Sequence, residues 1–186
     1  MLNGYLPAIL EGLVLTLQVS ALSLAIACLF GMAGATAKLS GSRAARWSAE
    51  VYTTLIRGLP ELVLMLLIFY GGQIGINRLA DAQGWGYIDI PPFAAGVLTI
   101  GFIFGAYLTE TFRGAILAVP RGQAEAGLAF ALTRRQVLLR IVLPQMVRHA
   151  IPGFANNWLI MIKASALVSI IGLDDKTRME MLVRAR

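Results

Sequence analysis

Long uncharged apolar runs alternate with short charged stretches along the chain. The first run extends from Gly12 to Ala37 and lies between Glu11 and Lys38. A bilayer core about 30 Å thick needs roughly 20 apolar residues in a helix, so this run can cross a membrane with some tilt. It is too long for the apolar part of a signal peptide, and no basic segment precedes it. We therefore expect it to remain as a helix.

Three further runs, 52–77, 90–109 and 150–173, are also long enough to span a membrane. Arg57, Pro60 and Glu61 interrupt the first half of run 52–77. The sequence predicts an all-α integral membrane protein with about four spanning helices, arranged as a single transmembrane domain over residues 1–186.

Two of these runs carry glycines four residues apart, Gly71 with Gly75 and Gly101 with Gly105. Small residues at this spacing allow helix backbones to approach closely. We expect both pairs to support helix packing.

Charge supports a membrane protein and gives an orientation. The chain is 58% hydrophobic and 14% charged, whereas soluble domains have about 25% charged residues. Its net charge of +6 is concentrated in the loops 38–46 and 113–148 rather than in a stripe interleaved with aromatics, so a nucleic-acid partner is not expected. Basic loops stay in the cytoplasm, which places the N-terminus and the loop 78–92 outside.

Cysteine and histidine chemistry is minimal in this chain. Cys28 and His149 are single residues of their kind, so no disulfide and no cysteine-based metal site forms within one chain. We expect no cofactor and no metal on this chain.

Residues 119–148 form a basic loop with its own helix signals. Pro120 and Gly122 end the preceding helix, and the stretch 123–132 is rich in Ala, Leu and Glu, which favours a short helix. Leu128, Ala131 and Leu132 can share one face of that helix.

A second helix signal comes directly after this stretch. Thr133 and Gln136 have the spacing of a capping box, and Pro144 and Pro152 are expected to break the helix that this box begins. A short helix held between two breaks and flanked by arginines suits docking of another protein. An amphipathic loop helix lying on the membrane is the alternative.

This loop resembles the EAA loop of bacterial ABC importer permeases, whose pattern is an EAA triplet, a later Gly, and Ile-x-Leu-Pro. Glu125-Ala126-Gly127 matches the triplet with Gly127 in place of the second Ala, and Ile141-Val142-Leu143-Pro144 matches the end. Ala131 stands where the family usually has Gly. Both departures exchange one small residue for another.

The resemblance extends over most of the chain and indicates the polar amino-acid subfamily. It includes Tyr107-x-x-Glu110-x-x-Arg113-Gly114, Arg57-Gly58-x-Pro60, and the segment 163–173. The segment 52–70 looks most similar to permease subunits of histidine/lysine-arginine-ornithine importers. The resemblance therefore implies import of basic amino acids or histidine across the bacterial inner membrane.

The resemblance also implies partners. They are a cytoplasmic ATPase dimer that carries ATP and magnesium, a second similar permease subunit as a heterodimer partner, and a periplasmic substrate-binding protein. Coupling to the ATPase is expected at Gln123, Glu125, Ala126, Gly127, Ala129, Ala131, Arg134 and Arg135. The chain itself has no GxxxxGK[ST] loop, so it is expected to be a transport subunit and not an enzyme.

Two other functions remain open from the sequence: an energy-independent channel, and a membrane assembly subunit with no path of its own. A docking helix argues against the channel, because a pore needs no seat for an ATPase.

Polar residues inside apolar segments are costly and often functional. Those predicted to line a translocation path are Glu61, Glu110, Arg113, Asn156, Asn157, Lys163 and Ser165. Structural roles compete: Glu110 and Arg113 are three residues apart and can pair, and the asparagines can hydrogen-bond between helices. Lys163 can pair, snorkel or meet a substrate carboxylate.

Permeases of this subfamily usually have five spanning helices, and no apolar run follows Leu173 here. The chain therefore looks truncated, and we expect this form to be impaired. ATP-coupled uptake by a complex containing only this form would contradict that expectation.

Overall fold

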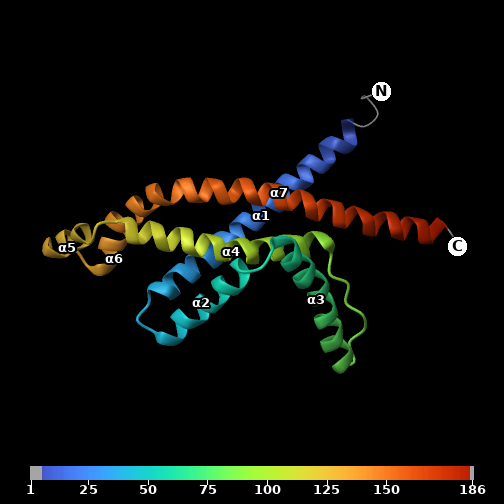
Figure 1. The fold of residues 1–186 in the computed structure, drawn as a ribbon, viewed down its shortest axis with the longest axis horizontal. Coiled ribbons are helices and arrows are strands. Elements are labelled where there is room, and N and C mark those ends of the chain that lie inside the picture. Colours follow the sequence, from blue (N-terminus) through green and yellow to red (C-terminus); the bar gives the residue numbers. More distant parts are fainter. Residues whose placement is uncertain (1–5, 185–186) are drawn as a thin grey trace. The chain divides into compact units, whose positions relative to one another are not determined.

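The computed structural model describes residues 6–184, with side chains described for residues 10–165. Seven α-helices follow one another: α1 (Leu6–Leu39), α2 (Arg43–Arg57), α3 (Glu61–Ala82), α4 (Pro92–Ala118), α5 (Arg121–Ala129), α6 (Arg134–Val137) and α7 (Leu143–Arg184) (Figure 1). A π-helical segment, η2 (Leu138–Val142), joins α6 to α7. No strand occurs in residues 6–184, which confirms the all-α prediction.

Three helices in the described part of the chain are long and apolar enough to cross a membrane: Leu10–Leu39, Glu61–Ala82 and Pro92–Leu117. The fourth run expected from the sequence, 150–173, falls within α7. Its second half lies outside the residues whose side chains are described.

The apolar run 52–77 is not one helix, as the sequence pattern suggested, because it is divided between α2 and α3. The amide of Gly58 closes α2 on the carbonyl of Thr54 at 3.0 Å, and Pro60 adopts an extended conformation before α3. A residue before proline is disfavoured in the helical region, so Leu59 forms the break.

The expectation that Pro144 and Pro152 break the helix is wrong. Helix α7 begins at Leu143 and includes both prolines. Pro144 lies in the first turn of α7, where its missing N–H costs little. The wider turns of η2 end just before it, and Gln145 Nε2 donates to the carbonyl of Ile141 at 3.1 Å.

The chain folds into two compact units, each built from segments distant in sequence. The first comprises the described parts of Met1–Ala27, Leu59–Ile103 and Trp158–Arg186, and the second comprises Cys28–Gly58 and Phe104–Asn157.

In the first unit, α1 and α4 approach closely, and the loop after α3 is held by side chains. A Cβ on Gly101 would lie 2.6 Å from Ile26 Cγ2, and Ser23 Oγ donates to the carbonyl of Val97 at 3.2 Å. Two residues of α3 hold the loop: Gln73 bonds the backbone of Ile88 and Ile90, and Asn77 Oδ1 accepts from the Ile88 amide at 2.8 Å.

In the second unit, the continuations of α1 and α4 pack through glycines. A Cβ on Gly34 would lie 2.2 Å from Thr109 Oγ1, and one on Gly105 would lie 2.6 Å from Phe30 Cβ. The packing role predicted for Gly101 and Gly105 is thus confirmed. Gly71 and Gly75 differ, because no described atom lies within 4 Å of a Cβ built on either.

Candidate functional site

The helix expected to dock a partner is α5, which begins shortly after α4 ends. Val119 and Pro120 separate the two helices, and Pro120 adopts the extended conformation that starts α5. Gln123, Glu125, Ala126 and Ala129 are exposed along α5. These two polar and two small side chains were predicted from the sequence, and Arg121 and Leu128 are exposed on the same helix.

Two backbone hydrogen bonds close the C-terminus of α5. The amide of Ala131 donates to the carbonyl of Leu128 at 3.0 Å, and the amide of Leu132 donates to that of Gly127 at 3.1 Å. This is the pattern of a Schellman motif, which requires a left-handed residue. Ala131 supplies it with φ of 60°, so it lies outside the helix and not on a shared face with Leu128, which corrects the expectation from the sequence.

The conformation of Ala131 has a cost and explains a sequence departure. A left-handed conformation disfavours a residue with a Cβ by about 1–2 kcal/mol, whereas glycine adopts it freely. The usual Gly of the EAA pattern therefore matches the backbone found here, and Ala131 occupies the same position under strain.

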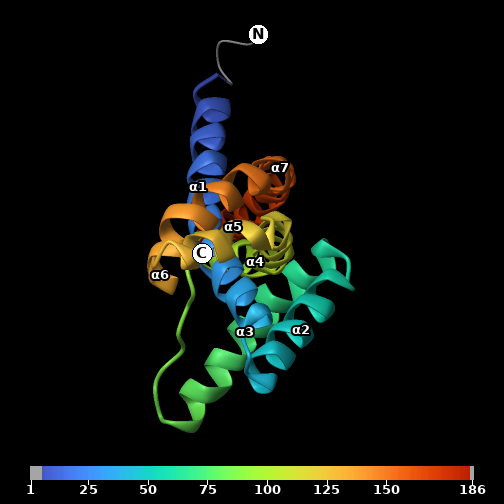
Figure 2. The same cartoon turned by 90° about the vertical axis from the view of Figure 1, so that its left-hand side faces the viewer.

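The capping box predicted at the start of α6 is confirmed. Thr133 Oγ1 accepts from the Gln136 amide at 3.3 Å, and Gln136 Oε1 accepts from the Thr133 amide at 2.9 Å. Arg134 and Arg135 lie in the first turn and are exposed. The box orients both arginines relative to α5, and Figure 2 shows the two short helices close together.

Gly127 is the buried residue of α5. A Cβ there would lie 2.6 Å from Ile141 Cδ1 and 3.0 Å from Val137 Cγ2. Gly127 lacks the methyl group of the second Ala in the EAA triplet, and the side chain of Ile141 from η2 occupies that space. Gly127 lets α5 and the segment after it pack directly.

An open groove of about 540 Å³ lies beside α5. It is lined by Gln123, Ala126, Gly127, Phe130, Leu132, Arg140, Ile141, Pro144, Gln145 and Arg148. Phe130 is 83% exposed. Phe130, Arg140 and Arg148 were not among the site residues predicted from the sequence. Phe130 could have been identified, because it is an aromatic residue near the end of the predicted helix 123–132, just before the capping box at Thr133.

A cluster of four charges joins three helices in the same unit. Lys38, at the end of α1, has a side chain only 5% exposed and pairs with Glu50 of α2 at 2.8 Å and with Glu110 of α4. Glu110 also accepts from Arg113 Nε at 2.9 Å. Glu110 and Arg113, both predicted for a translocation path, are thus engaged in ion pairs.

Two tyrosines of this unit lie between α2 and α4. Arg57 lies over the ring of Tyr107 at 5.7 Å, and a Cβ on Gly105 would lie 2.8 Å from Tyr52 Oη. Burial raises the pKa of the Tyr52 phenol above its ordinary value, because burial disfavours the charged form.

The other polar residues predicted for a path are dispersed. In the second unit Asn157 is buried and donates to Thr111 Oγ1 at 3.1 Å, which joins α7 to α4, while Asn156 is exposed. In the first unit Ser165 bonds within its own helix at 2.8 Å. Glu61 and Lys163 form no ion pair within the described residues.

Residues 27–182 match the family model of the binding-protein-dependent transport system inner membrane component. This match covers most of the chain and includes α2 to α6. The chain belongs to this family. Members of it are transport components, which agrees with a transport subunit embedded in a membrane.

Several named relatives of this transport family are amino-acid permeases. The histidine/lysine/arginine/ornithine transport system permease protein HisQ of Escherichia coli (strain K12) is 53% identical over 94% of this chain and 77% of its own length. The octopine transport system permease protein OccQ of Rhizobium meliloti is 38% identical over 95% of this chain and 75% of its own.

A solved structure of the same kind also matches. A crystal structure of an amino acid ABC transporter with histidines is 32% identical, with a TM-score of 0.74, over 98% of this chain and 80% of that one. The family resemblance inferred from the sequence is therefore confirmed.

Proposed function

We propose that this chain is a permease subunit of an ATP-driven importer of basic amino acids in the bacterial inner membrane. ATP and magnesium belong to a partner ATPase in this proposal. A second, similar permease completes a heterodimer, and a periplasmic binding protein delivers substrate.

The observation that carries the proposal is the geometry of α5. It is a nine-residue helix fixed at one end by a Schellman motif and followed by a capping box, with its polar and small side chains exposed. Preorganised surfaces lose less conformational entropy on binding. An energy-independent channel has no use for such a surface.

The exposed residues have distinct roles in this proposal. Gln123 and Glu125 bond the ATPase, Ala126 and Ala129 allow close approach, and Arg134 and Arg135 orient the loop. Gly127 acts from inside, by letting α5 pack against η2.

The N-terminus is periplasmic in this proposal, because the basic loops 38–46 and 113–148 belong in the cytoplasm. That orientation puts α5 and α6 on the side of the ATPase. It also puts the loop held by Gln73 and Asn77 on the side of the binding protein.

The substrate class is supported by the names of relatives. HisQ is named for histidine, lysine, arginine and ornithine, and ArtQ of Haemophilus influenzae, 36% identical over 94% of this chain, is an arginine transporter permease. Among the residues predicted for a path, Glu61, Asn156 and Lys163 are the better candidates for substrate contact. Glu110, Arg113 and Asn157 already have partners in this chain.

The test is reconstitution of the full chain in lipid nanodiscs with its ATPase, second permease and binding protein. ATP hydrolysis is measured with binding protein loaded with arginine, with histidine, or empty. We expect stimulation by loaded protein and its loss in Glu125→Ala. The matched control is Glu11→Ala, which removes an exposed carboxylate near the N-terminal end of α1.

Each outcome separates the possibilities. Assembly without stimulation by loaded binding protein would indicate a non-transporting assembly subunit. Uptake of arginine without any ATPase would indicate a channel. Equal loss in Glu125→Ala and Glu11→Ala would remove the specific role of α5.

A further inference from the structure

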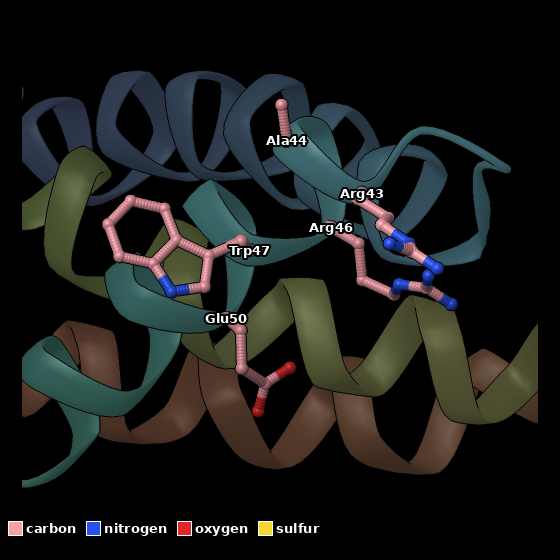
Figure 3. Close-up of a pocket in the computed structure, with 5 residues that line it drawn as sticks. All are labelled: Arg43, Ala44, Arg46, Trp47 and Glu50. Carbon is pink, nitrogen blue, oxygen red and sulfur yellow. The ribbon is translucent and has the colours of Figure 1, made fainter.

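An open pocket lies on α2, away from the residues that line the groove beside α5. Its lining residues are Arg43, Ala44, Arg46, Trp47 and Glu50. All five belong to one helix, and Figure 3 shows the guanidinium groups of Arg43 and Arg46 extending in the same direction. Residues three apart are neighbours on a helix, so the two arginines can hold one anion together.

The acidic residue of this pocket is already neutralised. Glu50 Oε2 lies 2.8 Å from Lys38 Nζ, and in Figure 3 its carboxylate points away from the two guanidinium groups. In the cluster described above, the charges of Lys38 and Arg113 balance those of Glu50 and Glu110.

The arginines of the pocket carry charge that the cluster does not balance. Neither Arg43 nor Arg46 forms an ion pair with any described residue. The pocket therefore presents two positive charges. Guanidinium groups match phosphate with two parallel hydrogen bonds, so an anion with phosphate chemistry fits them.

The position of the pocket selects the source of that phosphate. The span Leu10–Leu39 ends four residues before α2 begins, which places Arg43 at the membrane boundary. Trp47 is 70% exposed, and tryptophan is enriched where headgroups meet acyl chains. The opposite face of α2 packs inward through Ala49, Thr53 and Ile56.

We propose that Arg43, Arg46 and Trp47 bind the headgroup of an anionic phospholipid at the cytoplasmic surface of the membrane. The two guanidinium groups hold the headgroup phosphate, and the indole of Trp47 lies against the acyl boundary. The amide of Ala45 is already capped by Ser42 Oγ at 3.4 Å. The groove beside α5 shares none of these residues, so substitutions in the pocket leave the lining of that groove intact.

The test measures phospholipid binding to the purified full chain by native mass spectrometry from detergent. The probes are phosphatidylglycerol, phosphatidylcholine and inorganic phosphate. We expect phosphatidylglycerol to bind more tightly than phosphatidylcholine, and Arg43→Gln/Arg46→Gln to weaken it about twenty- to thirtyfold, because each arginine near an anionic surface contributes about fivefold.

The matched control is Arg134→Gln/Arg135→Gln, which removes the same charge from an exposed pair on α6. It should leave phosphatidylglycerol binding within about twofold, because its arginines lie outside the pocket. Trp47→Ala should weaken binding with all charges retained. If the glutamine variant does not fold by circular dichroism, Arg43→Lys/Arg46→Lys keeps the charge and should still weaken binding.

Three results would overturn the proposal. Equal weakening by both arginine pairs would show attraction by net charge alone. Full competition by inorganic phosphate at the same concentration would assign a free anion site. Unchanged lipid binding together with loss of ATPase co-purification in Arg43→Gln/Arg46→Gln would assign the pocket to a protein partner.

Discussion

The contact between α1 and α4 and the contact between α5 and η2 both depend on glycine, yet they are built differently. Between α1 and α4, Gly31, Gly34 and Gly105 let backbones approach over several turns, and the buried Lys38 of α1 forms an ion pair with Glu110 of α4. In the loop, Gly127 alone faces a side chain, and hydrogen bonds at the helix ends provide the remaining order. Extended close packing creates a rigid core, whereas end capping holds a small helix whose side chains stay largely exposed.

The largest change in stability should follow loss of the central cation of the core. Lys38→Met leaves Glu110 and Glu50 without it, and we expect the free energy of unfolding to fall by about 3–5 kcal/mol. Unfolding of the detergent-solubilised chain by sodium dodecyl sulfate measures this. Glu50→Gln is the control, since Glu50 is 62% exposed and should cost under about 1 kcal/mol. Equal losses would show that burial of Lys38 is not the cause.

A smaller loss should follow from filling the glycine contact. Gly34→Ala places a methyl 2.2 Å from Thr109 Oγ1, and we expect a loss of about 1–3 kcal/mol from overpacking. The same unfolding assay applies. Gly71→Ala, which meets no described atom within 4 Å, should not destabilise the chain. A comparable loss of stability in both variants would show that the close approach of α1 and α4 is not the cause.

At Ala131, after α5, introducing a glycine should increase stability rather than reduce it. Ala131→Gly removes the left-handed strain and should stabilise α5 by about 1 kcal/mol. Ala129→Gly, inside α5, should destabilise it by about 1 kcal/mol. Hydrogen exchange of the α5 amides measures both. Faster exchange in Ala131→Gly would contradict the strained Schellman motif.

The smallest change in stability, with a large change in assembly, is expected for Phe130→Ser. The ring is 83% exposed, so the free energy of unfolding should change by less than about 0.5 kcal/mol. Affinity for the ATPase should fall about tenfold or more, as for an aromatic anchor of an interface. Co-purification quantifies it, with Leu139→Ser, an exposed residue outside the groove, as the control. Retained assembly in Phe130→Ser would exclude it as an anchor.

The sequence predicted the local features well, because local signals suffice for them. The capping box of Thr133 and Gln136, the Glu110–Arg113 pair and the all-α class follow from spacing and apolar length. The helix boundary expected at Pro120 and Gly122 agrees with α4, which ends at Ala118. The boundary inside run 52–77 was not predicted, because the break at Leu59 lies within an apolar stretch.

Other features depended on contacts that no spacing records. Gly71 with Gly75 has the same pattern as Gly101 with Gly105, but of these two pairs the second meets a neighbouring helix among the described residues. Phe130 was missed because its exposure depends on the turn at Ala131. The pairing of Lys38 with Glu110 spans 72 positions.

The sequence by itself determined the membrane class and the family, because apolar length, charge distribution and short motifs are local properties of the chain. Only the tertiary structure decided which polar groups are already paired, which glycines are in contact and which side chains stay exposed. These depend on how helices distant in sequence approach one another, and that approach sets the burial and pairing of each side chain.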